Sequence, residues 1–73
     1  MSMQYAVVLE PGEDDYIIAS VPSLPGCHTQ GRTREEALQN IQEAMRGYLA
    51  VLEEDGEPLP KPDIDIVMVE VAA

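Results

Sequence analysis

The hydrophobic positions in residues 3–10 and 16–21 alternate with a period of two, which is typical of β-strands. In the first segment the odd positions are all apolar, and Ala6 and Val8 make the other face half apolar. A Pro-Gly pair and three acidic residues separate the two segments, so we expect them to pair antiparallel across that loop. Residues 27–30 are short and polar, which suits a third strand at the edge of a sheet.

The sequence predicts one helix, beginning at Thr33. Residues 33–36 form a capping box, in which the Thr33 hydroxyl accepts from the amide of Glu36 and the Glu36 side chain reaches back. Apolar side chains then recur at helical spacing, and the helix should end near Asp55 with Gly56 as its cap. The apolar stripe consists of Leu38, Ile41, Met45, Tyr48, Leu49 and Leu52.

The last predicted element is a strand over residues 64–71, reached through a linker with three prolines. This segment is apolar on both faces, which indicates a strand that is covered on both sides. The element order is therefore β-β-β-α-β, an α+β fold in a single domain over residues 1–73. With a right-handed crossover through the helix, we expect a mixed four-stranded sheet of order 3-2-1-4 with the helix on one face.

One helix leaves the other face of this predicted sheet uncovered. That face would place Ala6 and Val8 of the first strand with Val67 and Val69 of the last. An open apolar face on a small domain usually marks an interface, so we predict a homo-oligomer, formed through this face or through the edge of the last strand. The alternative is a scatter of small aliphatic side chains exposed to solvent.

The charge of the chain narrows its possible partners. Four basic and fourteen acidic side chains among 73 residues give a net charge of −10, which repels nucleic acids and anionic membranes. We therefore expect no direct DNA binding. No apolar run approaches the about 20 residues of a membrane span, and the N-terminus lacks the layout of a signal peptide, so we expect a cytoplasmic protein.

Candidate catalytic and metal-binding groups are sparse. His28 is the single histidine, and its neighbour Cys27, the single cysteine, should point to the opposite face of the strand. The two side chains therefore do not form a nucleophile–base pair within one chain. The spacing of a zinc site is absent, and the acidic loop lacks the alternating ligands of a calcium loop. We predict no catalysis, no cofactor and no bound metal.

Carboxylates gather at two places in the chain. One group follows the first strand, and the other lies at the predicted C-terminus of the helix, where the helix dipole makes each acid cost roughly a few tenths of a kcal/mol. Acids placed against local stability point to contact with a basic partner, and an acidic surface kept for solubility is the alternative. The candidate partner-binding residues are Glu10, Glu13, Asp14 and Asp15 in the first group, and Glu53, Glu54 and Asp55 in the second.

A longer motif covers the centre of the chain. Leu-Pro-Gly-Cys at residues 24–27, Thr-x-Gly-x-Thr at 29–33 and Glu-Glu-Ala at 35–37 closely resemble, in this order and spacing, the signature of the HicB-like antitoxin family. The likeness extends over nearly the whole chain. It implies a fold akin to a degraded ribonuclease H domain and neutralisation of a small basic HicA-type toxin that cleaves RNA with a histidine. Many members carry a C-terminal DNA-binding segment, whereas this sequence stops at Ala73, directly after the last predicted strand.

Two classes of function stay open. The first is a protein-binding antitoxin, or a stand-alone relative of one that has no toxin partner. The second is a small metal-dependent nuclease remnant that would use His28 and the acidic loop. A ribonuclease H site needs a carboxylate in the middle of the first strand, where this chain has Tyr-Ala-Val-Val at residues 5–8, so the sequence favours the first class.

Overall fold

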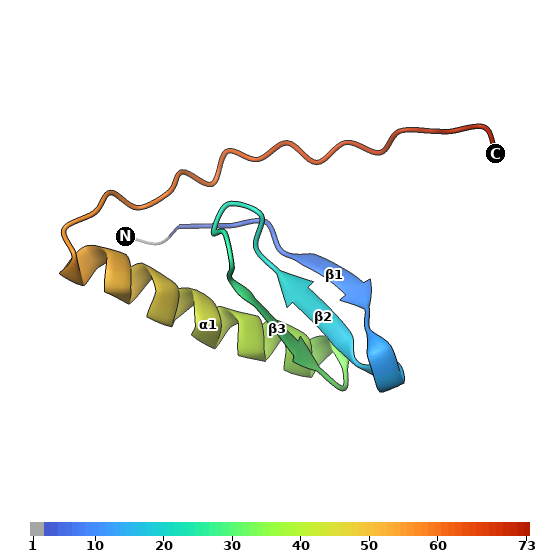
Figure 1. Ribbon diagram of the computed structural model, residues 1–73, viewed down its shortest axis with the longest axis horizontal. Coiled ribbons are helices and arrows are strands. Elements are labelled where there is room, and N and C mark those ends of the chain that lie inside the picture. Colours follow the sequence, from blue (N-terminus) through green and yellow to red (C-terminus); the bar gives the residue numbers. More distant parts are fainter. Residues whose placement is uncertain (1–2) are drawn as a thin grey trace.

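The computed structural model describes residues 3–73, which form a small sheet covered by one helix (Figure 1). Strands β1 (Val8–Pro11), β2 (Ile17–Ser20) and β3 (His28–Gly31) pair antiparallel in chain order. The long helix α1 (Arg34–Glu54) follows and packs on β3 and β2. The chain beyond the helix runs as a separate extended ribbon outside the sheet.

The prediction of a mixed four-stranded sheet is wrong. In the described part of the chain, residues 64–71 pair with no strand, so the sheet has three antiparallel strands and not the order 3-2-1-4. The family resemblance implied a ribonuclease H-like sheet, and without the fourth strand this sheet is not formed. The physical reason lies in the linker, where Pro58, Pro60 and Pro62 lack backbone donors and hold the residues before them extended.

Strand β1 is shorter than its hydrophobic alternation predicted. Its pairing starts at Val8 opposite Ser20 and ends at Pro11 opposite Ile17. The residues before Val8 carry the same alternation, but β2 is four residues long and offers them no partner. A pattern of alternating side chains therefore marks which face is apolar, while the length of the neighbouring strand decides how much of it is paired.

The N-terminus of α1 is capped as the sequence predicted. The Thr33 hydroxyl accepts from the backbone N–H of Glu36 at 3.0 Å, which satisfies one of the free donors of the first turn. The Glu36 carboxylate in turn accepts from the backbone N–H of Arg32 at 2.9 Å. These two bonds fix where the chain turns from β3 into the helix.

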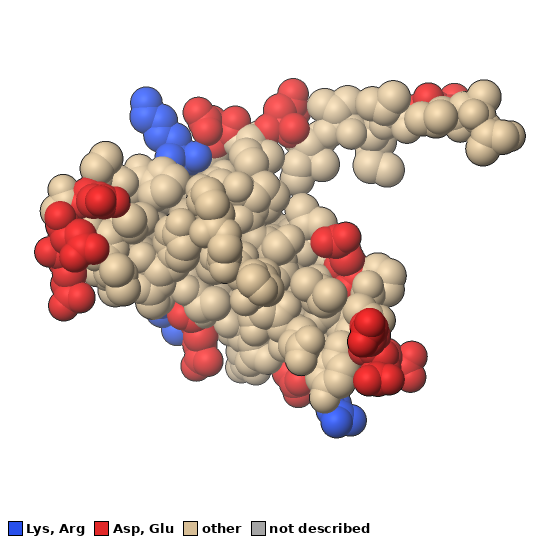
Figure 2. All heavy atoms as spheres, viewed as in Figure 1, with Lys and Arg blue, Asp and Glu red and all other residues tan. Residues whose placement is uncertain are grey.

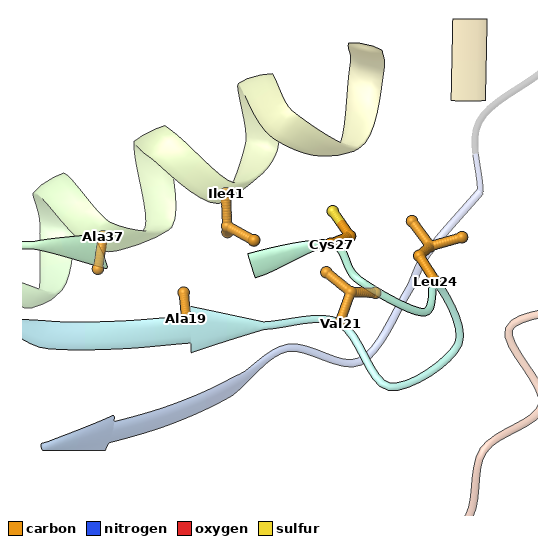
Figure 3. Packing of buried hydrophobic residues seen from close by; sticks show 6 residues of the cluster. All are labelled: Ala19, Val21, Leu24, Cys27, Ala37 and Ile41. Atoms are coloured by element: carbon orange, nitrogen blue, oxygen red, sulfur yellow. The ribbon is translucent and has the colours of Figure 1, made fainter. Parts of the chain in front are cut away.

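The core is closed by the turn between β2 and β3. The backbone N–H of Leu24 donates to the Val21 carbonyl at 3.0 Å, and that of Cys27 donates to the Leu24 carbonyl at 2.9 Å. In Figure 3 the side chains of this turn lie beside Ile41 of α1, between the helix and the sheet. The Leu-Pro-Gly-Cys motif is thus a folded turn that supplies core side chains. The buried hydrophobic residues are Ala19, Val21, Leu24, Cys27, Ala37 and Ile41.

Strand β3 and the start of α1 approach each other closely at Gly31. A Cβ atom at this position would lie 2.8 Å from the Cα of Ala37, so no larger residue fits without a shift of backbone. One turn later the Asn40 amide donates to the carbonyl of Gln30 at 2.9 Å. The glycine and the asparagine together hold the helix against the last strand of the sheet.

Candidate functional site

The first group of carboxylates, which we call the loop cluster, is Glu10, Glu13, Asp14 and Asp15. Glu10 lies in β1, and the other three form the short 3-10 turn η1 (Glu13–Asp15) between β1 and β2. All four side chains are exposed. Asp14 and Asp15 have φ of 55° and 63°, a left-handed conformation that aspartate tolerates better than most residues. The tight turn therefore projects its carboxylates into solvent.

The second group, which we call the helix-end cluster, is Glu53, Glu54 and Asp55. All three are exposed, and the last turn of α1 contains no basic residue. Gly56 ends the helix with φ of 69°, and its N–H donates to the carbonyl of Glu53 at 3.1 Å. The cap keeps the three acids at the negative end of the helix dipole, as the sequence predicted.

The two clusters lie at opposite ends of the molecule. Figure 2 shows acidic side chains gathered at the end of α1 and, across the body, at the turn that follows β1. The fold brings the members of each cluster together and keeps the two clusters apart. The two clusters therefore form two separate acidic surfaces.

The predicted oligomer residues are not brought together within the chain. Ala6 and Val8 are half-buried in and before β1, on the sheet face away from the helix. Val67 and Val69 lie outside the sheet and are 66% and 77% exposed, because the strand that was to carry them beside β1 does not form. The uncovered apolar surface of this protein is therefore mostly in its C-terminal segment.

His28 and Cys27 have separate environments. His28 is exposed, with its Nδ1 3.1 Å from the carbonyl oxygen of Gly26, whereas Cys27 is buried. Among residues 3–73, no three histidine, cysteine, aspartate or glutamate side chains lie close enough together to hold a metal ion. In the same range, no helix combines the length and the hydrophobicity that a membrane crossing requires.

The buried thiol predicts a pH dependence of stability. Burial raises the pKa of Cys27 above its ordinary value, so the unfolded chain ionises first as the pH rises. The stability that the neutral thiol contributes is complete below the unfolded pKa, about 8.5, and is lost as the pH rises through the folded value. We therefore expect the melting temperature of the wild type to fall more steeply than that of Cys27→Ala between about pH 8 and pH 10.

Thermal melts followed by circular dichroism at a fixed protein concentration measure this difference. The two proteins differ only at residue 27, so the contributions of all other groups cancel in the comparison. Parallel pH profiles of the two melting temperatures would show that the thiol contributes nothing.

Sequence reasoning missed the role of Tyr5. Its hydroxyl donates to the carbonyl of Pro60 at 2.6 Å and so ties the proline linker to the segment before β1. A tyrosine in an otherwise aliphatic alternation was the available signal, because a half-buried phenol usually finds an acceptor.

Comparison with known proteins points to the same family as the motif over residues 24–37. The family model described as HicB-like antitoxin of bacterial toxin-antitoxin system matches residues 5–71, a range that includes the extended C-terminal segment. The chain is 43% identical over 67 residues to a UPF0150 protein of Thermoplasma acidophilum, covering 92% of this chain and 97% of that protein.

Two further relatives extend this picture. A UPF0150 protein of Archaeoglobus fulgidus is 47% identical over 57 residues, which is 75% of this chain and 83% of the relative. Antitoxin HicB 1 of Photorhabdus laumondii is 41% identical over 61 residues, which is 84% of this chain and 39% of that longer protein. Because the family model spans almost all of the residues and the relatives match along most of the chain, this protein belongs to the HicB-like antitoxin family.

Proposed function

We propose that this chain is a cytoplasmic antitoxin that neutralises a small basic toxin of the HicA type by binding it, without catalysis of its own. Membership of the antitoxin family supports the role in general terms. The observation that carries the choice of a basic partner is the exposure of seven carboxylates in two clusters on a chain of net charge −10. The same charge opposes direct contact with nucleic-acid phosphates.

The clusters are suited to steer a basic protein. Exposed charges of one sign raise the rate of encounter with an oppositely charged surface, and salt screens this attraction over a distance of about 10 Å at 0.1 M. The acids at the end of α1 oppose the helix dipole, so they lower local stability unless a cation approaches them. Apolar contacts then hold the complex after the encounter, because exposed ion pairs contribute little to affinity.

Three variants of equal charge test the proposal. The loop variant combines Glu13→Gln, Asp14→Asn and Asp15→Asn, and the helix-end variant combines Glu53→Gln, Glu54→Gln and Asp55→Asn. Asparagine keeps the left-handed turn possible at Asp14 and Asp15. The matched control removes three exposed carboxylates outside both clusters and consists of Glu35→Gln, Glu43→Gln and Asp63→Asn.

The measurement is the association rate with a small basic protein that co-purifies with the full chain, at low and at high ionic strength. We expect one cluster variant to lose about tenfold in rate at low salt, with the difference vanishing at high salt, while the control changes less. If the two cluster variants and the control all associated at the same rate at low salt, the clusters would serve solubility alone. If no small basic protein co-purifies with the full chain, the toxin-binding proposal is wrong and a stand-alone role replaces it.

A further inference from the structure

The last part of the chain exposes an unusual run of apolar side chains. Six large aliphatic side chains fall within residues 64–71, which we call the C-terminal arm, and their exposed fractions run from 40% at Ile64 to 93% at Met68. Single exposed aliphatic side chains are ordinary on protein surfaces, but a contiguous run of them is not. The arm consists of Ile64, Asp65, Ile66, Val67, Met68, Val69, Glu70 and Val71.

The arm also stands away from the body of the protein. The radius of gyration is 14.0 Å, whereas a compact chain of this length has about 11 Å. Figure 2 shows the end of the chain projecting beyond the packed atoms. The bond from Tyr5 to Pro60 anchors its root, and the alternating prolines act as a stiff spacer that carries the arm outward.

The outer edge of β1 resembles the arm in having apolar side chains on both faces. In the segment that leads through β1, Tyr5, Val7 and Leu9 pack on the core side, while Ala6 and Val8 lie on the opposite face. This edge is thus apolar on both faces, and so is the arm. Residues 3–7, which have no partner strand, lead directly into β1, and together residues 3–11 are at least as long as the arm.

The outer edge of β3 matches the arm poorly. Its exposed side chains, His28 and Gln30, are polar, and the Gln30 carbonyl is already bonded to the Asn40 amide. An apolar arm placed there would face polar groups on one side. Of the two edges of the sheet, β1 is the one that the arm complements.

We propose that the arm of one copy adds as a strand to the β1 edge of a second copy, and that the second copy returns its arm to the first. Each chain has one unpaired apolar edge and one unpaired apolar arm. In a two-fold dimer, each edge therefore pairs with the arm of the other copy. The exchange gives the exposed arm backbone its hydrogen-bond partners and removes an open edge that favours aggregation. This inference does not depend on the toxin-binding proposal.

Charge provides a signature that separates this dimer from binding of a basic protein. Each copy carries a net charge of −10, and the arm itself contains Asp65 and Glu70. The two copies repel each other, so added salt strengthens their association. Added salt weakens association with a basic partner, because it screens the attraction between opposite charges.

Sedimentation equilibrium of the full chain tests the dimer. We expect a mass of twice 8.0 kDa and a dissociation constant that falls as salt is added. The double variant Val67→Glu, Val69→Glu should raise that constant about a hundredfold, because carboxylates would be buried in the interface. The control is Val51→Glu, which places a carboxylate at a 55% exposed valine on α1, outside the arm, and should leave the dimer intact. A monomeric wild type, or a dimer that persists in the double variant, would overturn the proposal.

The position of the arm is tested on the wild type, without any substitution. In a mixture of isotope-labelled and unlabelled chains, filtered nuclear Overhauser spectra report contacts between different copies alone. We expect contacts from residues 64–71 of one copy to residues 4–9 of the other. Arm contacts that occur only within one chain, or that reach α1 of the second copy instead of β1, would contradict the exchange.

Discussion

Replacing Leu24 by alanine is expected to lower the free energy of unfolding by about 3 kcal/mol. Leu24 is fully buried and packs in the core that the β2–β3 turn closes against α1. The substitution removes three side-chain carbons and leaves a cavity, since the hydrogen-bonded turn has little freedom to collapse. A domain of this length has a total stability of about 4–11 kcal/mol, so the substitution removes between about a quarter and three quarters of it.

Urea denaturation followed by circular dichroism measures the loss. The protein concentration must be the same for all variants, because association of copies would add to the apparent stability. The matched control is Val51→Ala, which removes apolar atoms from a residue that is 55% exposed and should change stability by less than about 0.5 kcal/mol. If Leu24→Ala were as mild as this control, the turn would not be part of the core.

The second large effect is expected at Gly31. A methyl group there would lie 2.8 Å from the Cα of Ala37, and because its neighbours are backbone atoms, the helix start must move. We expect Gly31→Ala to lower the free energy of unfolding by about 2–3 kcal/mol. The shift should also lengthen the Asn40–Gln30 hydrogen bond that joins α1 to β3.

Gly47 provides a control in which the same substitution, glycine to alanine, should raise the free energy of unfolding instead of lowering it. It lies in the interior of α1 with no atom within 4 Å of an added Cβ, so Gly47→Ala should stabilise the protein by about 0.5–1 kcal/mol through helix propensity. Urea denaturation of the two variants side by side measures both effects. A Gly31→Ala variant as stable as the wild type would show that β3 and α1 can separate at no cost.

These two positions give the family motif a structural meaning. Leu24 and Cys27 of the Leu-Pro-Gly-Cys segment are core residues, and Gly31 allows the close approach of strand and helix. Thr33 caps the helix that follows. The residues by which the family is identified therefore build the fold, while the residues proposed to meet a partner lie outside the motif, in the loop and helix-end clusters.

Local patterns correctly predicted the helix and the core-facing side of the segment through β1. The capping box and Gly56 set the ends of α1, because the bonds involved join residues within a few positions of each other. The odd positions of the segment through β1 pack on the core, as their alternation predicted. The sequence also located both acidic clusters, since carboxylates in a turn and at a helix end are exposed in most folds.

The fourth strand was predicted from the same kind of pattern and is wrong. Hydrophobic alternation indicates that residues 64–71 need cover, but it does not say which chain supplies the cover. Pairing with β1 in the same molecule depends on the path of the proline linker, and that path is a property of the assembled structure. The three prolines were visible in the sequence, yet their effect on the direction of the arm was not.

The sequence by itself determined the helix with its caps, the three paired strands, the acidic charge and the family, because each rests on residues close together in the chain or on composition alone. Only the tertiary structure decided that the sheet stops at three strands, that the acidic clusters lie at opposite ends, and that the apolar side chains of residues 64–71 remain uncovered. These features depend on contacts between residues far apart in the sequence, such as Tyr5 with Pro60, whose geometry is set by the packing of the whole chain.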